Sequence, residues 1–163
     1  MGTVKRQSRG LPLVDLFLVA TLILLIIVAM AIPHVDRSRM AANQASAVGA
    51  LRAIDTAETG YASPYHTGYS PTLAALGPPL SGNGTASAAG LIDSALASGS
   101  KWGYRFVYSA TPDATGRNST YSVNANPIVA GTTGVNYYYT DQTGVIRQNS
   151  TREASASDSP LGG

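Results

Sequence analysis

A long apolar run near the amino terminus constrains this chain more than any other feature. The run extends from Leu11 to Ile32, and its 22 residues include one charged side chain, Asp15. At about 1.5 Å per helical residue, a helix of this length covers roughly 33 Å, which is enough to cross a bilayer core of about 30 Å. A carboxylate inside such a helix is costly in lipid, so Asp15 is a candidate functional residue.

A short basic leader precedes the apolar run and ends at Gly10. It contains Lys5, Arg6 and Arg9 and no acid. Without residues 1–10, eight basic side chains remain against nine acidic ones, which changes the formal net charge from +2 to −1. A chain of this charge lacks the basic surface that nucleic-acid binding needs, so we predict no specific nucleic-acid partner. The chain also has no cysteine, and disulfides therefore do not staple its fold.

Two interpretations of this amino terminus are general. The first is a secretory signal peptide with a small-x-small cleavage motif at Ala29-Met30-Ala31, but the apolar run exceeds the roughly 7–15 residues that are typical and contains Asp15. The second is a plain single-pass anchor with basic residues on its cytoplasmic side. The anchor accounts for everything except Gly10 and Asp15.

The segment from Arg9 to Leu16, RGLPLVDL, accounts for both residues. It resembles the start of type IV pilins and pseudopilins, in which a basic leader ends in Gly and an apolar helix follows with an acid at its fifth position. The resemblance implies that a prepilin peptidase cuts between Gly10 and Leu11, and that the same enzyme class methylates the new amine of Leu11. It also implies that Asp15 pairs with the amino terminus of a neighbouring subunit in a homopolymer.

This resemblance is close from residue 6 to about residue 33, with several departures. Asp15 replaces the family's usual Glu, Pro12 the usual Thr or Ser, and Leu11 the usual Phe. Pro33, the predicted helix kink, falls one residue later than in the common pattern, and the usual mid-helix glycine is absent. Proline is tolerated in the first helical turn, so none of these changes removes the implied chemistry.

We predict that the helix continues beyond Pro33 to about Ala62, where Ser63-Pro64 supplies a stop. Apolar residues recur there at intervals of three or four, which is typical of an amphipathic helix that covers a domain core. This stripe consists of Val48, Leu51, Ile54, Ala57 and Tyr61. Charged residues lie off the stripe, at Arg52, Asp55 and Glu58.

The remainder of the chain predicts a sheet. A loop region follows from Ser63 to Ser100, in which Ser70 looks like the cap of a short helix and residues 90–97 could form another helical turn. Alternating patterns then predict four strands, at residues 102–108, 120–125, 135–140 and 145–148. Consecutive hairpins make the sheet antiparallel, and a long helix followed by strands gives an α+β, pilin-like fold.

The predicted organisation has three parts. Residues 1–10 are a leader peptide, and residues 11–62 are the long helix, in which residues 11–32 form the transmembrane and polymerisation segment. Residues 63–163 are a C-terminal globular domain, whose Ser/Ala/Gly-rich tail from Thr151 is predicted to be flexible.

No set of catalytic or metal-binding residues is apparent. The two histidines, His34 and His66, lie on different predicted elements, and there is no cysteine. Asp113 and Asp141 are predicted to be turn residues. We therefore predict no metal site, no cofactor and no enzymatic activity.

The resemblance predicts a structural subunit of a type IV pilus that serves adhesion, twitching motility or DNA uptake. The implied partners are copies of the chain itself, a prepilin peptidase, an assembly platform with its ATPase, and inner-membrane lipid before assembly. The implied location is the inner membrane first and an extracellular fibre afterwards.

Two alternatives stay open. A major-type pseudopilin of a type II secretion system shares this amino terminus and would form a periplasmic pseudopilus. The lack of a dense acid cluster for calcium in the C-terminal loops favours the pilus over the pseudopilus. A membrane-anchored module that never polymerises is the second alternative.

Overall fold

The computed structural model describes the backbone of residues 12–162 and the side chains of residues 12–27 and 35–162. The chain forms two compact units, which divide between Ser38 and Arg39. We call the described part of the first, residues 12–38, the helical unit, and residues 39–162 the folded unit.

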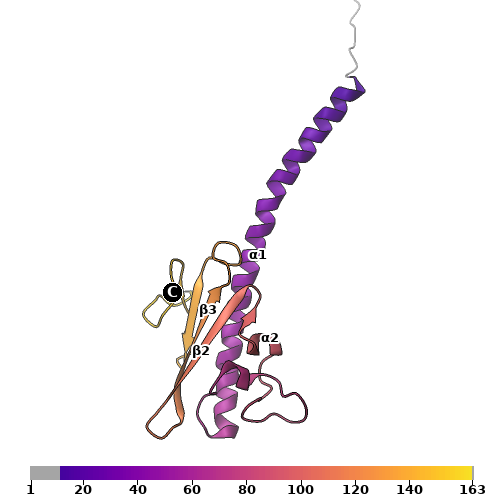
Figure 1. Ribbon diagram of the computed structural model, residues 1–163. Helices are drawn as coiled ribbons and strands as arrows, with labels where there is room; N and C mark the ends of the chain where they lie inside the picture. Colours follow the sequence, from indigo (N-terminus) through magenta and orange to yellow (C-terminus); the bar gives the residue numbers. More distant parts are fainter. Residues whose placement is uncertain (1–11, 163) are drawn as a thin grey trace, which may run out of the picture. The chain divides into compact units, whose positions relative to one another are not determined.

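One helix, α1 (Leu13–Tyr65), contributes to both units (Figure 1). It begins directly after Pro12. Proline suits the start of a helix because it lacks the N–H group that would have no hydrogen-bond partner there. The carbonyl of Pro12 accepts hydrogen bonds from the N–H groups of Asp15 (2.8 Å) and Leu16 (3.2 Å). The start of α1 therefore agrees with the tolerance of proline in the first turn.

The helix ends three residues beyond the predicted end at Ala62, so the predicted stop at Ser63-Pro64 is wrong. In the last turn a proline removes a single backbone hydrogen bond. Packing offsets this loss, because the ring centroid of Tyr65 lies 4.7 Å from that of Tyr61, which is buried in the core.

The folded unit contains a five-stranded antiparallel sheet with its strands in sequence order (Figure 1). The strands are β1 (Ser100–Lys101), β2 (Tyr104–Pro112), β3 (Asn118–Pro127), β4 (Tyr137–Asp141) and β5 (Arg147–Asn149). All four neighbouring pairs are antiparallel. The predicted α+β fold with an antiparallel sheet is confirmed.

The sheet has one strand more than the four predicted. Trp102 and Gly103, predicted to begin a strand, form a two-residue turn in which Lys101 pairs with Tyr104. Their φ angles are 48° and 74°, as a type I′ hairpin turn requires. Tryptophan favours strands, so the alternating pattern of the sequence hid this turn and the short strand β1 before it.

The core of the folded unit lies between α1 and one face of the sheet. Tyr121, Val123 and Ala125 alternate along β3 and are buried, while the residues between them are only half-buried. Leu51 and Ile54 of α1 belong to the same buried cluster, and neither exposes any surface to solvent. Burial of a side chain of this size contributes about 1.5–3 kcal/mol, so this stripe stabilises α1 on the sheet.

Two short helical segments connect α1 to the sheet. The 3₁₀ helix η1 (Leu73–Leu76) is capped by Thr72 rather than by the predicted Ser70, with Thr72 Oγ1 accepting from the N–H of Ala75 (3.3 Å). The helix α2 (Ser94–Ala97) lies within the predicted range 90–97 and is capped by Asp93.

The tail beyond Thr151, predicted to be flexible, is held on the sheet. The N–H of Leu161 donates to the carbonyl of Ile146 (2.7 Å), and the N–H of Gln148 donates to the carbonyl of Ser159 (3.0 Å). The tail thus covers the outer edge of β5, which would otherwise be an open strand edge. Its small, polar composition suggested mobility, but these long-range backbone bonds fix it.

Candidate functional site

Asp15 lies in the first turn of α1, and its side chain is exposed. A carboxylate at this position interacts favourably with the positive end of the helix dipole. Among the described residues, no side chain forms a hydrogen bond or an ion pair with the Asp15 carboxylate. The structure therefore presents Asp15 as an accessible anionic group at the start of the helix.

The helix around Asp15 is apolar on every side. Twelve large apolar side chains between Leu13 and Ile27 are exposed, from 51% at Ile26 to 85% at Leu13. Thr21 is the other polar residue of this stretch, and its hydroxyl donates to the carbonyl of Phe17 (2.8 Å). We call residues 12–27 the apolar segment. A helix that is apolar all round is ordinarily buried in protein or lipid.

Other predicted site residues fall outside the described part of the chain. Gly10 and Leu11, the predicted cleavage and methylation sites, are among them. The backbone of α1 continues through residue 33, but the side chain of Pro33 lies outside the described residues, and its kink stays a prediction. Within the described residues, no helix offers an apolar stretch of the length and hydropathy needed to cross a membrane.

The sequence predicted that Glu58, an acid of α1, lies off the apolar stripe, and this placement is wrong. Glu58 exposes no surface to solvent. Its Oε1 accepts from the hydroxyl of Ser70 (2.5 Å) and its Oε2 from the N–H of Ser70 (2.8 Å). The hydroxyl of Tyr108, on β2, donates to the carbonyl of Ser70 (2.8 Å). These bonds join α1, the loop before η1 and the sheet.

The pKa values in this cluster follow from burial. Desolvation raises the pKa of Glu58 above its ordinary range, and the hydrogen bonds from Ser70 oppose this only in part. Desolvation likewise raises the pKa of Tyr108. A signal for the burial of Glu58 was present in the sequence, because Glu58 follows Leu51 by seven residues and Ile54 by four, on the same helix face.

A second carboxylate of α1 is bound by the sheet. Asp55 accepts from the hydroxyl of Tyr121 on β3 (2.9 Å) and from that of Thr140 on β4 (3.1 Å). Burial is the main cause that raises the pKa of Asp55. Asp55 thus bonds directly to the sheet, and Glu58 is linked to it through Ser70 and Tyr108. We call this pair of carboxylates, which joins α1 to the sheet, the clamp.

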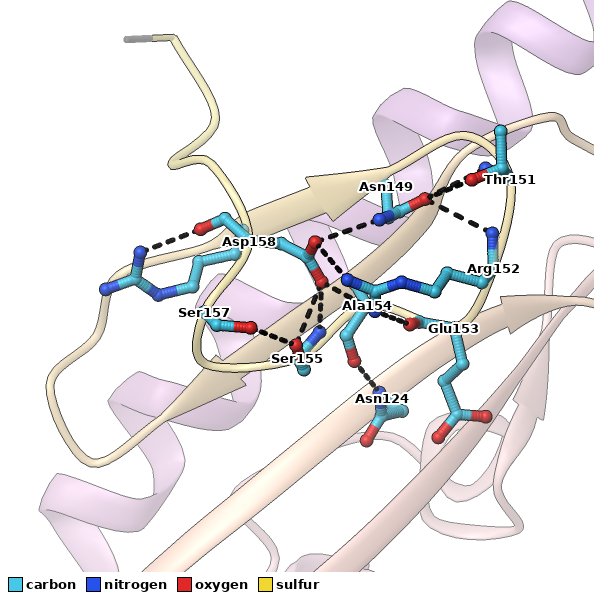
Figure 2. Close-up of polar contacts among 10 residues, drawn as sticks. Asn124, Asn149, Thr151, Arg152, Glu153, Ala154, Ser155, Ser157 and Asp158 are labelled. Carbon is cyan, nitrogen blue, oxygen red and sulfur yellow. Dashed lines mark hydrogen bonds and ion pairs between the residues drawn. The ribbon is translucent and has the colours of Figure 1, made fainter.

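A third polar cluster fixes the tail (Figure 2). The carboxylate of Asp158 accepts from Asn149 Nδ2 (2.9 Å), from the N–H of Ser155 (2.8 Å) and from Arg152 Nη2 (2.8 Å). The bond from Asn149 is the main cause that lowers the pKa of Asp158 to about 2. Asn124 of β3 donates to the carbonyl of Ala154 (2.6 Å), which ties this loop to the sheet.

The predicted turn roles of two other acids are confirmed. Asp113 Oδ1 accepts from the N–H and the hydroxyl of Thr115 (2.7 and 2.6 Å). Asp141 Oδ1 accepts in the same way from Thr143 (2.9 and 2.6 Å). Among the described residues, no three His, Cys, Asp or Glu side chains gather closely enough to hold a metal ion.

Comparisons of the chain with protein-family models, with curated proteins and with solved structures gave no match.

Proposed function

We propose that this chain is a pilin-like structural subunit. A prepilin peptidase removes residues 1–10 and methylates Leu11, the inner membrane stores the subunit, and the first half of α1 drives its polymerisation. The resulting surface fibre serves adhesion, motility or DNA uptake. The observation that carries the proposal is the apolar segment, which exposes apolar side chains around the whole helix and has a single acid, Asp15, in its first turn.

The physical argument concerns what could cover this surface. Twelve large apolar side chains are exposed in this segment, and their exposure to water is unfavourable. Burial of this surface in lipid, or in a bundle of identical helices, lowers the free energy. In either low-dielectric environment an uncompensated Asp15 is expensive, and a cationic partner offsets that cost. The amine of Leu11 in a neighbouring subunit is the partner that the resemblance implies. Such a pair would fix the axial register of incoming subunits.

The first test is mass spectrometry of the mature protein from cells that contain a prepilin peptidase. The proposal expects a chain that begins with N-methylated Leu11. A mature chain that begins at Met1 or at Ile32 contradicts it, because the first corresponds to an uncut anchor and the second to a cleaved signal peptide.

The second test compares fibre yield among variants of acids in α1. Asp15→Ala is expected to abolish or severely reduce sheared fibres while cleavage continues, and Asp15→Glu to retain them. Asp36→Ala is the matched control, since Asp36 is also an exposed acid of α1 but lies beyond the apolar segment. Normal fibre yield from Asp15→Ala would contradict the proposal. Electron microscopy of sheared surface material distinguishes a surface pilus from a periplasmic pseudopilus.

A further inference from the structure

Exposed apolar side chains gather at one end of the folded unit. Eight large apolar side chains are exposed within residues 39–162, and four of them belong to the β1–β2 turn and the β3–β4 connection. We call these four the end patch: Trp102, Ile128, Val129 and Val135, each 44–51% exposed. The other four are distributed over the η1–α2 loop, β2 and the β4–β5 turn.

The two loops that carry the end patch lie against each other. The N–H of Ile128 donates to the carbonyl of Gly103 (2.9 Å), which joins the β3–β4 connection to the residue after Trp102. A Cβ at Gly103 would lie 2.9 Å from the Cβ of Thr133, so the two loops are in close contact. The N–H of Thr133 donates to the carbonyl of Val129 (2.9 Å), which closes the connection on itself.

The patch lies where the chain enters the folded unit. Asn43 Nδ2 donates to the carbonyl of Thr133 (3.0 Å), and Gln44 Oε1 accepts from the N–H of Val135 (3.3 Å). These two residues are in the second helical turn after Arg39, the first residue of the unit. Figure 1 shows the connection that follows β3 beside this part of α1.

Trp102 occupies a position that does not suit it locally. Its φ of 48° is in the left-handed region, and Asn, Asp or Gly is favoured at this place in a type I′ turn. Its ring is half exposed, and Lys101 Nζ lies 3.8 Å from the ring centroid. Tryptophan is enriched where proteins meet the headgroup layer of a membrane, and basic side chains near that layer are attracted to anionic lipids.

We propose that the end patch rests on the headgroup layer of the bilayer in the unassembled subunit, with Trp102 as its anchor. The inference rests on the proposed function, since it needs the apolar run up to Ile32 to lie in the membrane. Six residues separate Ile32 from Arg39. Even fully extended, at roughly 3.5 Å per residue, they keep the start of the folded unit within about 25 Å of the bilayer core.

The charges around the patch suit anionic headgroups. Two cations lie on the strands that flank the turn at Trp102, Lys101 on β1 and Arg105 on β2, and Arg39 is the first residue of the folded unit. Two acids lie near the patch. Asp93 is paired with Lys101 (2.5 Å), and the carboxylate of Glu153 accepts from Asn126 (2.7 Å). The acids are thus engaged within the protein, while Arg39 and Arg105 are exposed.

The test uses the fluorescence of Trp102, the only tryptophan of the chain. The full-length protein is reconstituted in vesicles of phosphatidylcholine and phosphatidylglycerol whose acyl chains are brominated close to the headgroups, close to the bilayer centre, or not at all. The proposal expects the loss of most Trp102 emission with bromine close to the headgroups. Bromine at the centre should quench less.

Two double variants provide the comparison. Ile128→Ser with Val129→Ser removes half of the end patch from exposed positions and is expected to restore most of the emission. Leu80→Ser with Val107→Ser is the matched control, because it removes two exposed apolar side chains elsewhere in the folded unit. The control is expected to be quenched like the wild type.

The outcomes separate this inference from the proposed function. If the protein floats with the vesicles in alkali but Trp102 is not quenched, the headgroup contact is wrong and the membrane step of the proposed function stands. If the protein does not float with the vesicles, both fail. If Trp102 becomes protected from iodide only on fibre formation, the patch contacts a second copy of the chain and the headgroup contact is overturned.

Discussion

The two parts of α1 use apolar residues in opposite ways. In the apolar segment every large apolar side chain is at least half exposed, whereas Leu51 and Ile54, farther along the same helix, expose none of their surface. Both parts are helical and rich in aliphatic residues. The difference is that the second part has one apolar stripe that matches one face of the sheet, while the first is apolar on all sides. Burial thus depends on a matching partner surface as well as on hydropathy.

The acids of the two parts differ in the same way. Glu58 and Asp55 find hydroxyl and N–H donors from the loop before η1, from β3 and from β4. Asp15 has no such donor among the described residues. The second part of α1 therefore finds its buried contacts and its hydrogen-bond donors within one chain. We infer that lipid or another copy of the chain covers the first part.

The largest effect that tests this comparison is expected from Leu51→Ala. The substitution leaves a cavity between α1 and the sheet, so the free energy of unfolding of the folded unit should fall by about 2–5 kcal/mol. Chemical denaturation followed by circular dichroism measures the change.

The matched control is Leu22→Ala in the apolar segment, where Leu22 is 59% exposed. This substitution should change the free energy of unfolding by less than about 0.5 kcal/mol, because it removes no contact within the folded unit. Equal losses from Leu51→Ala and Leu22→Ala would show that the two parts of α1 are not energetically distinct.

A smaller effect is expected from Glu58→Gln. The pKa of Glu58 is raised in the folded protein, mainly by burial, above the ordinary value of 4.5. The folded protein therefore binds this proton more tightly than the unfolded chain does. The resulting stabilisation of the folded state is fully present below pH 4.5 and is lost as the pH rises through the raised folded-state pKa. Glutamine keeps one acceptor and removes the charge, so the variant should be more stable than the wild type at neutral pH, by on the order of 1 kcal/mol.

Thermal unfolding of both proteins across the acid range provides the measurement. The difference between them should shrink as the pH falls toward 4.5, where the wild-type carboxyl binds its proton. Asp55, whose pKa is also raised, is present in both proteins, and its repulsion of Glu58 is part of what the Glu58→Gln substitution removes. A difference that grows toward low pH would contradict the proposed cost of the buried carboxylate.

The smallest effect is expected from Asp158→Asn, which alters the tail. An amide in place of the carboxylate cannot accept from Asn149, Arg152 and Ser155 together, so the loop should open more often. Amide hydrogen exchange at Ser155 and Leu161 should become severalfold faster, while the melting temperature changes by no more than about 2 °C. If amide hydrogen exchange in Asp158→Asn were as slow as in the wild type, the backbone hydrogen bonds alone would be sufficient to hold the tail. Asp113→Asn is the matched control, since Asp113 bonds only within its own turn.

Local patterns were sufficient to predict the long helix and four strands, but not strand β1 or all of the element limits. The spacing of Leu51, Ile54 and Tyr61 predicted the buried face of α1, and alternation predicted four of the five strands. The turn at Trp102 was missed because a residue that favours strands occupies a left-handed turn position. The continuation of α1 past Pro64 was missed because it depends on the packing of Tyr65 against the core.

Some features of the candidate site could be predicted from the sequence, and others could not. The apolar run, its single acid and the Gly10–Leu11 junction are properties of consecutive residues, and they were visible without any structure. The clamp of Asp55 and Glu58, the network around Asp158 and the end patch each join residues that are distant in sequence. No local pattern contains them.

The sequence by itself determined that one helix would be apolar on every side at its start and amphipathic afterwards, because helical periodicity places neighbouring residues on known faces. It also determined that Asp15 would stand in the first turn of that apolar stretch. Only the tertiary structure decided which polar groups would be buried and which apolar groups would stay exposed. That outcome depends on partners brought together by the chain's path: Ser70 beside Glu58, β5 beside the tail, and Ile128 beside Trp102.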